Sequence, residues 1–323
     1  MKKVKFAIIG PGTIAHSFMN GINELDNAEV IAIVSRSKER AESFASKYNL
    51  KYAYDDYEEC LNNKEVDAIY VATPPFMHFP NTKLALEKGK HVICEKPFTV
   101  DVDELKQLIK IAKEKGLLLM EAMKSPFIPV NIAVKKLIDQ GEIGDIITLE
   151  GSFTYNGGPR YDHFHFIKGN GGGALYDVGV YPLFISLFFI DSEVKDYCGY
   201  AKKAPTGADS LASVILQFEN GVIANIRGGI EVNTYQGVYI YGTKGKIFIP
   251  EFWVASKAFI DYYDGRETKI ITGDASNEFK YQVGHFVDLI NKGLKESDVM
   301  THQISLKVME IMYSLVNKWN NEV

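Results

Sequence analysis

The sequence has little cysteine, no long apolar run and no excess of basic charge. Its three cysteines, Cys60, Cys94 and Cys198, are scattered and form no C-x-x-C pair, which is typical of reduced thiols in a cytoplasmic protein. The longest apolar run, 178–190, is shorter than the roughly 20 residues that cross a bilayer, so it predicts a buried helix. A net charge of −5 argues against nucleic acid or an anionic membrane as the main partner.

The sequence also lacks an internal repeat and a low-complexity linker, yet its two parts differ in pattern. Between residues 4 and 121, short apolar runs alternate with helical segments. The strongest runs are Val4–Ile9, Val30–Val34, Asp67–Ala72, His91–Cys94 and Leu117–Met120. Such apolar strands separated by helices are typical of a parallel sheet covered on both faces. We therefore predict a doubly wound α/β domain of the Rossmann type over residues 1–122.

From residue 123 onward, apolar and polar residues begin to alternate. The alternation is clearest in Ala212–Phe218, Val222–Ile230 and Gly237–Tyr241, and glycine-containing turns separate these runs. Alternation of this kind indicates antiparallel strands with one buried and one more polar face. We predict a second, α+β domain over residues 123–323, built on a large, open and mostly antiparallel sheet.

The most informative motif is the glycine turn after the first strand, which reads Gly10-Pro11-Gly12-Thr13-Ile14-Ala15. Gly10 allows a tight turn, Gly12 lets backbone approach a phosphate, and the small Ala15 lets the helix lie close to the strand. The N–H groups at the start of the helix then face the anion. An ordinary strand-to-helix turn is the alternative, but the strand before and the helix after favour a dinucleotide-binding site.

An acidic residue is missing where NAD-binding folds usually have one, at the end of the second strand. The sequence there is Ser35-Arg36-Ser37-Lys38. Ser35 can donate to a 2′-phosphate, and the guanidinium of Arg36 can clamp that phosphate or stack on adenine. The alternative is that Arg36 and Lys38 merely begin a solvated helix. We favour NADP(H) over NAD(H) as the cofactor.

Two further segments follow strands of the predicted parallel sheet. Thr73 and Pro74 begin a proline-pinned loop beside the cofactor site, where His78 either contacts the substrate or caps a helix that starts near Asn81. Glu95-Lys96 and the proline after it follow the strand at 91–94. Ligands bind at the carboxyl ends of strands in such folds. We therefore predict that Lys96 lies beside the nicotinamide and bonds a substrate oxygen, although a plain surface lysine is the alternative.

A second constellation, from Gly171 to Tyr181, contains three glycines, Asp177 and Tyr181. If a helix begins near Asp177, the two residues are four apart and share one face, as an acid/base pair would. Asp177 could equally cap the helix, and Tyr181 could be a core aromatic. The spacing alone leaves these readings open.

The best candidate metal motif is Asp162-His163-Phe164-His165, because H-x-H on a strand places both rings on one face. No third ligand is evident nearby, so we predict no metal site. His163 and His165 are better placed as substrate-pocket residues, together with Met123 and the loops at 155–166 and around Tyr235.

Together these motifs resemble the glucose–fructose oxidoreductase, inositol dehydrogenase and MocA (Gfo/Idh/MocA) family over essentially the whole chain. Glu95-Lys96 with its proline and the segment from Gly171 to Tyr181 carry the resemblance. Inositol-type members have histidine where this chain has Tyr181. That tyrosine, with Met120-Glu121-Ala122-Met123, makes the chain similar to the dimeric dihydrodiol dehydrogenase branch.

The resemblance implies a nicotinamide-dependent dehydrogenase or reductase that acts on a small sugar, polyol or diol. It makes Lys96 catalytic and carries the family's catalytic roles onto Asp177 and Tyr181, with Tyr181 as the acid/base and Asp177 binding a second hydroxyl. It also implies a homodimer or homotetramer formed through the open sheet of the second domain. Some relatives are instead glycosidases that retain NAD, and others are NAD(P)-binding regulators without turnover. The presence of both Lys96 and Tyr181 favours the enzyme.

Overall fold

The computed structural model describes residues 3–169 and 171–321. The chain divides into two compact units, one comprising residues 1–124 and 277–306 and the other residues 125–276 and 307–323. In the described part of the chain, no helix is long and apolar enough to cross a membrane.

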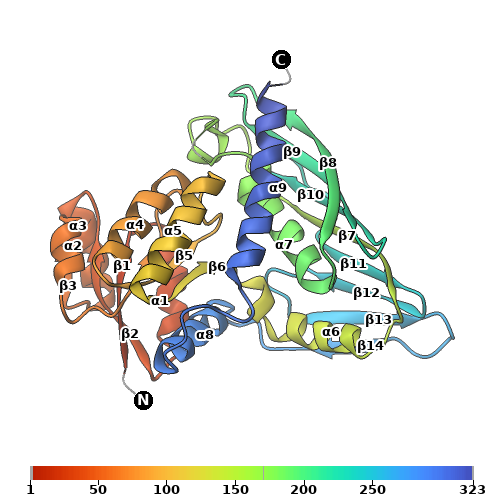
Figure 1. Ribbon diagram of the computed structural model, residues 1–323, viewed down its shortest axis with the longest axis horizontal. Helices are drawn as coiled ribbons and strands as arrows, with labels where there is room; N and C mark the ends of the chain where they lie inside the picture. The colour runs from red at the N-terminus through yellow and green to blue at the C-terminus, as the bar shows by residue number, and fades with distance from the viewer. Residues whose placement is uncertain (1–2, 170, 322–323) are drawn as a thin grey trace. The chain divides into compact units, whose positions relative to one another are not determined.

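The first unit is built on a six-stranded parallel sheet in the order β3-β2-β1-β4-β5-β6. Its strands are β1 (Val4–Ile9), β2 (Ala28–Val34), β3 (Tyr52–Tyr54), β4 (Ala68–Val71), β5 (His91–Glu95) and β6 (Leu119–Ala122). Its helices are α1 (Thr13–Ile22), α2 (Lys38–Tyr48), α3 (Tyr57–Asn62), α4 (His78–Glu87), α5 (Val102–Lys115) and α8 (Phe279–Asn291), with the short 3₁₀ turn η1 (Pro75–Met77). This is the predicted doubly wound fold, and the fold class is confirmed (Figure 1).

Helix α8 belongs to this first unit, although the sequence pattern assigned everything after residue 122 to the second domain. It packs on α1, where the backbone of Phe279 comes so close that a Cβ on Gly21 would lie 2.6 Å from the Cβ of Phe279. Phe286 reaches the sheet and contacts Phe6 at 6.0 Å between ring centroids. Burial of these aromatic rings holds α8 against β1, with Phe6 and Phe286 separated by 280 residues in sequence.

The second unit is built on an eight-stranded sheet in the order β14-β13-β12-β11-β7-β10-β9-β8. Its strands are β7 (Ile146–Thr154), β8 (Val194–Lys203), β9 (Asp209–Phe218), β10 (Ile223–Gly229), β11 (Gly237–Gly242), β12 (Gly245–Pro250), β13 (Lys257–Tyr262) and β14 (Lys269–Thr272). Its helices are η2 (Ser125–Phe127), α6 (Pro129–Asp139), η3 (Phe164–Phe166), η4 (Leu175–Gly179) and α7 (Val180–Phe189), with the last part of α9 (His302–Asn321). Only β7 and β10 pair in parallel, so the predicted open, mostly antiparallel sheet is confirmed.

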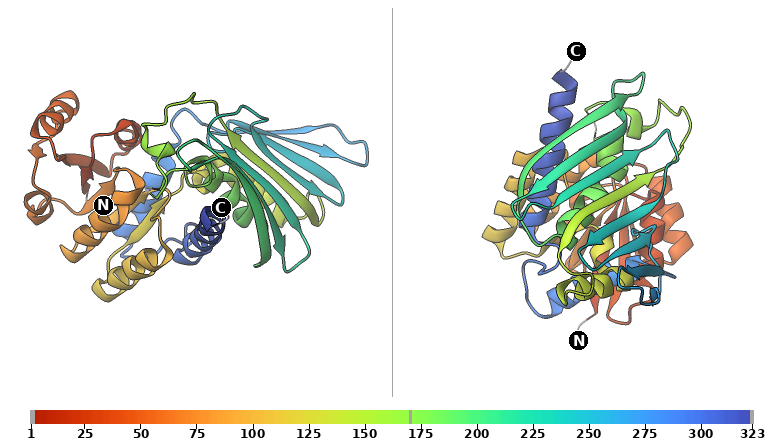
Figure 2. Two further views of the ribbon diagram at one scale, coloured as in Figure 1. Left: turned by 90° about the horizontal axis from the view of Figure 1, so that it is seen from above. Right: turned by 90° about the vertical axis from the view of Figure 1, so that its right-hand side faces the viewer.

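The two faces of this sheet differ because successive side chains point to opposite sides. On β9, Val214 is buried while Ile215 is exposed. The apolar α7 packs against β7 and β10. The right-hand view of Figure 2 looks onto the other side, which we call the outer face, and no helix among the described residues of the second unit crosses it.

Candidate active site

The glycine turn of the first unit connects β1 to α1 as predicted. Gly10 has a φ of +100°, and a Cβ there would lie 3.0 Å from the carbonyl oxygen of Ala72. Gly12 caps α1 without a side-chain hydrogen bond, and the first turn, from Thr13 and Ile14 onward, contains no acidic residue. The N–H groups of this helix terminus therefore suit an anion such as the pyrophosphate of a dinucleotide, and the residues fit the cofactor.

The segment after β2 places Ser35 and Arg36 at the carboxyl edge of the parallel sheet, where the glycine turn after β1 also lies. Ser35 is buried, and its Oγ accepts a hydrogen bond from the N–H of Ser37 at 3.3 Å. Arg36 is exposed. Burial raises the pKa of Tyr57, and the nearby charge of Arg36 opposes that rise. The structure adds Arg40, which lines a cavity of about 470 Å³ together with Pro11 of the glycine turn. The sequence signal for Arg40 was its place on the first turn of α2, four residues after Arg36.

His78 joins two loops at this edge. Helix α4 begins at His78 rather than near Asn81, because the 3₁₀ turn η1 leads directly into it. The fully buried ring places Nδ1 2.8 Å from the carbonyl oxygen of Pro97 and Nε2 2.8 Å from that of Thr73. Burial lowers the pKa of His78 to about 4, so at neutral pH the ring carries one N–H and donates to one carbonyl. The ring lies between the loop of Thr73 and Pro74 and the loop of Lys96, 2.8 Å from a carbonyl oxygen of each, and hydrogen-bonds one of them.

Lys96 follows the last residue of β5, at the carboxyl edge of the parallel sheet. Glu95, which precedes it, is buried and accepts hydrogen bonds from the hydroxyl of Tyr70 at 2.5 Å and from the N–H of Lys96 at 3.3 Å. Burial raises the pKa of Glu95, and the Tyr70 hydrogen bond and the charge of Lys96 oppose that rise. The side chain of Glu95 is therefore buried rather than exposed to solvent, and it holds the backbone of Lys96 through a hydrogen bond.

Glu121, a residue of the Met120–Met123 motif that was assigned no chemical role, is a buried carboxyl group. It lies on β6 beside Cys94 of β5, and it accepts hydrogen bonds from the N–H of Phe98 at 3.1 Å and the hydroxyl of Ser305 at 2.8 Å. Burial raises its pKa to about 7. The sequence signal for this residue was a glutamate inside an otherwise apolar strand.

Met123, predicted to line the substrate pocket, directly follows β6 and is 1% exposed.

Asp177 and Tyr181 of the second unit lie on either side of a helix junction. Asp177 is in the π-helical turn η4, and Tyr181 is in the first turn of α7. A helix does begin near Asp177, at residue 174, but Leu175–Gly179 form a π turn, so the spacing of a regular α-helix does not apply between Asp177 and Tyr181. Buried Asp209 accounts for the local geometry, because its Oδ2 accepts from the N–H of Leu175 at 2.8 Å. Single π turns inside helices are frequent at functional sites.

His163 and His165 lie around the 3₁₀ turn η3 and not on a strand, so the expected placement of both rings on one strand face is wrong. The rings meet edge to face at 4.5 Å between centroids. His165 Nδ1 lies 3.3 Å from Asp177 Oδ2, and both atoms lie near the hydroxyl of Tyr155. Within residues 3–169 and 171–321, no group of three or more histidine, cysteine, aspartate or glutamate side chains is arranged to hold a metal ion.

Comparison with known proteins places this geometry in a family. The model of the oxidoreductase family with an NAD-binding Rossmann fold, GFO/IDH/MocA, matches residues 4–123. The model of the GFO/IDH/MocA C-terminal domain matches residues 132–248. The chain belongs to the GFO/IDH/MocA oxidoreductase family. The resemblance inferred from the motifs is confirmed.

Relatives within the family are similar over almost their whole length. Trans-1,2-dihydrobenzene-1,2-diol dehydrogenase of Mus musculus is 31% identical over 96% of this chain and 95% of its own. The scyllo-inositol 2-dehydrogenase (NADP(+)) IolU of Bacillus subtilis is 33% identical over 96% and 95%. KijD10, a 3-ketoreductase of Actinomadura kijaniata solved with NADP and TDP-benzene, superposes with a TM-score of 0.88 at 25% identity and covers 97% of both chains.

Proposed function

We propose that this protein is an NADP(H)-dependent dehydrogenase or reductase of a small sugar, polyol or diol. The observation that carries the proposal is the placement of Lys96 after β5, at the same carboxyl edge of the parallel sheet as the glycine turn at Gly10. The bound nicotinamide supplies hydride exchange with a carbinol or carbonyl carbon. Relatives whose names specify a diol and an inositol support the substrate class.

Three side chains have assigned roles in the proposal. Tyr181 takes the proton of the reacting hydroxyl during oxidation and returns it during reduction. Lys96 donates a hydrogen bond to the substrate oxygen, and Asp177 accepts one from a second hydroxyl. Aromatic packing holds the ring of Tyr181 in position for proton transfer. Its centroid lies 5.4 Å from that of Phe153, which in turn stacks on Trp253.

The test is turnover of a sugar, polyol and diol panel with wild type, Tyr181→Phe and Lys96→Ala. Both variants should lose turnover while NADPH affinity, measured by fluorescence titration, stays nearly unchanged. A variant that retains near-normal kcat would remove that residue from the mechanism. NADPH binding by a wild type that turns over no member of the panel would contradict the proposed substrate class.

The preference for NADP(H) depends on the basic residues after β2. The four residues after Val34 contain no carboxylate, and Arg36 is exposed there. Arg40 and Glu39 both line the neighbouring cavity beside Pro11. Arginine binds phosphate through two parallel N–H donors. Two relatives have NADP in their names or were solved with it, which supports the preference.

Arg36→Ala and Arg40→Ala should each weaken NADPH binding about tenfold and leave NADH binding unchanged, because NADH lacks the 2′-phosphate. The comparison of the two nucleotides is an internal control for folding. Equal losses for both nucleotides, or tighter binding of NADH by the wild type, would contradict the assignment.

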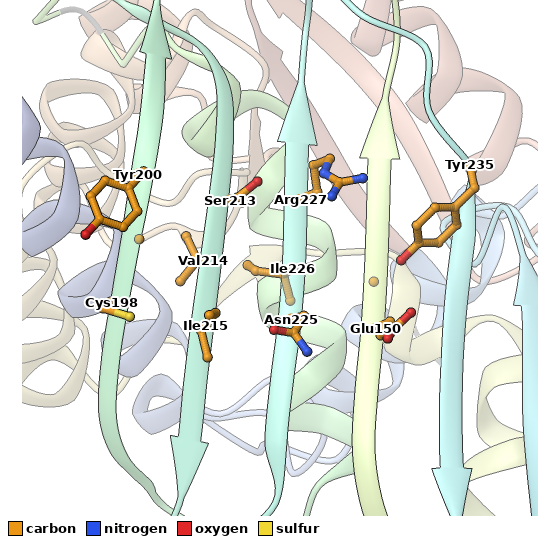
Figure 3. Close-up of a pocket in the computed structure, with 12 residues that line it drawn as sticks. Glu150, Cys198, Tyr200, Ser213, Val214, Ile215, Asn225, Ile226, Arg227 and Tyr235 are labelled. Atoms are coloured by element: carbon orange, nitrogen blue, oxygen red, sulfur yellow. The ribbon is translucent and has the colours of Figure 1, made fainter.

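We also propose that the outer face of the eight-stranded sheet binds a second copy of this chain. Tyr239 is central there, with Phe248 at 4.2 Å and Tyr235 at 6.0 Å between ring centroids. Figure 3 shows Arg227 and Glu150 on neighbouring strands β10 and β7 of the same face. Exposed apolar area combined with charges of both signs suits a self-complementary twofold contact. Tyr235, expected to line the substrate pocket, instead lines a hollow on this outer face.

Tyr239→Glu should convert the oligomer to a monomer in light scattering coupled to size exclusion, because it buries two unpaired charges at the twofold contact. Leu294→Glu, at an exposed apolar residue of the first unit, is the control and should not change the mass. A monomeric wild type would refute this part of the proposal.

A cytoplasmic location completes the proposal, and the cysteines support it. Cys60, Cys94 and Cys198 are all free thiols, and the first two are buried. Burial raises the pKa of Cys60 to about 12, so that thiol is unreactive. Localisation of the tagged protein by fractionation tests this assignment.

A further inference from the structure

Three segments of the second unit bring their side chains together around Asp177. Tyr155 comes directly after β7, His165 is in η3 and Asp177 is in η4. The Tyr155 hydroxyl donates a hydrogen bond to Asp177 Oδ2 at 2.8 Å. His165 Nδ1 lies 3.3 Å from that same oxygen and 3.3 Å from the Tyr155 hydroxyl oxygen. The side chains of Asp177 and His165 are 14% and 24% exposed, so the cluster is shielded from bulk water on most sides.

The donors in this cluster follow from its geometry. An ionised carboxylate only accepts hydrogen bonds, so the Tyr155 hydroxyl and the His165 Nδ1 both need their hydrogens. Burial raises the pKa of Tyr155, and the charge of Asp177 raises it further, so Tyr155 remains a donor throughout the neutral range. Tyr155 therefore serves as a hydrogen-bond donor to Asp177, and the acid/base role remains the one proposed for Tyr181.

Backbone hydrogen bonds hold the three segments in place. The N–H of Gly173 donates to the carbonyl oxygen of His165 at 2.7 Å, which ties η3 to the start of η4. The N–H of Asp177 donates to the carbonyl oxygen of Gly173 at 3.0 Å. The N–H of Tyr155 donates to the carbonyl oxygen of Gly229, the last residue of β10, at 2.9 Å. The two donors that face Asp177 are thus themselves anchored.

We propose that Tyr155 and His165 are positioning residues that hold the Asp177 carboxylate in one orientation and so select substrates with a second hydroxyl. The inference rests on the proposed function, in which Asp177 accepts a hydrogen bond from that hydroxyl. The terminal torsion of an aspartate side chain is broad, so an unsupported carboxylate samples many orientations. The hydrogen bond from Tyr155 and the adjacent His165 ring, which contacts both the Tyr155 hydroxyl and Asp177 Oδ2, restrict it. An oriented acceptor binds a hydroxyl at a defined place on the substrate.

The first test is the Tyr155→Phe variant, assayed with a vicinal diol from the panel that the wild type turns over. KM for the diol should rise about tenfold, the usual effect of losing a hydrogen bond to a charged group, with a smaller change in kcat. A substrate without the second hydroxyl should show no such rise, and NADPH affinity should stay unchanged. The matched control is Tyr161→Phe, which loses a 2.8 Å hydrogen bond to Glu231 without contacting Asp177.

A second arm uses His165 and does not depend on whether Tyr155→Phe folds. The amide of asparagine can place an N–H near the position of Nδ1, so His165→Asn should retain most of the diol preference. His165→Ala should lose it. Equal KM values for the two variants would contradict a positioning role for this ring.

A double-mutant cycle separates this inference from the proposed function. Tyr155→Phe should add almost nothing in an Asp177→Asn background, because residues that act through one another are not additive. If Asp177→Asn by itself leaves KM for the diol unchanged, the substrate role proposed for Asp177 is wrong. If Asp177→Asn raises KM but the Tyr155 effect is absent or fully additive, only the positioning inference is wrong.

Discussion

Replacement of Glu121 by glutamine should make the protein more stable at pH 8 without changing its stability at pH 5. The buried carboxyl group of Glu121 accepts from the N–H of Phe98 and from the hydroxyl of Ser305. A glutamine of the same shape keeps an oxygen for Phe98, and its amide can donate to the Ser305 oxygen. The substitution therefore removes a charge while both hydrogen bonds are retained.

The magnitude follows from the pKa of Glu121. Burial, with a contribution from the nearby Glu95, raises this pKa from 4.5 to about 7. The folded state therefore holds the proton more tightly than the unfolded state does. The contribution of protonated Glu121 to the free energy of unfolding is complete below about pH 4.5 and is lost as the pH rises through 7. Between pH 5 and pH 8 the wild type should lose about 2–3 kcal/mol through this one group.

Urea unfolding at both pH values, followed by circular dichroism, measures the effect. The difference in the free energy of unfolding between Glu121→Gln and wild type should grow by about 2–3 kcal/mol from pH 5 to pH 8. Glu42→Gln, on the exposed side of α2, is the control and should follow the wild type at both values. A Glu121→Gln protein that changes in parallel with the wild type, to within about 0.5 kcal/mol, would refute the buried-charge argument.

Three further substitutions test packing and backbone geometry within each unit. Gly21→Ala should lower the free energy of unfolding in urea by about 1–3 kcal/mol, because the new Cβ would clash with Phe279. The cost of this clash should exceed the helix-propensity gain of about 1 kcal/mol, and a more stable variant would contradict the α1–α8 contact. Asp209→Ala should lower stability by about 1–3 kcal/mol and turnover with it, because the buried N–H of Leu175 loses its acceptor; unchanged kcat would show that η4 does not need this cap. Gly10→Ala should add about 1–2 kcal/mol of backbone strain and weaken NADPH binding in fluorescence titrations, and unchanged affinity would argue against a cofactor at the turn.

Most of the fold could be predicted because its elements have strong local signals. The apolar runs that became β1, β2, β4, β5 and β6 are each long enough to read directly. The three-residue β3 is too short to leave a period in the sequence. The place of α8 could not be read either, since it depends on how Phe279 and Phe286 fit α1 and the sheet.

The candidate site was predictable by residue type but less so by conformation. The glycine turn, Lys96, Asp177 and Tyr181 stand out by spacing and chemistry. The π turn that carries Asp177 does not, because the buried cap that accompanies it, Asp209, lies more than 30 residues further along the chain. The burial of Glu121 and the cavity contact of Arg40 were not predicted for a related reason, since each side chain acquires its partners from a neighbouring element.

The sequence by itself determined the architecture, the nature of the cofactor site and the family, because strand periodicity, glycine at a positive φ and short motifs are local properties. Only the tertiary structure decided which polar groups are buried together. Tyr155, His165 and Asp177 come from separate segments, and their contact exists because β7, η3 and η4 converge. Hydrogen bonding and desolvation depend on distance in space, so these partnerships, and the pKa shifts that follow from them, arise only when the chain has folded.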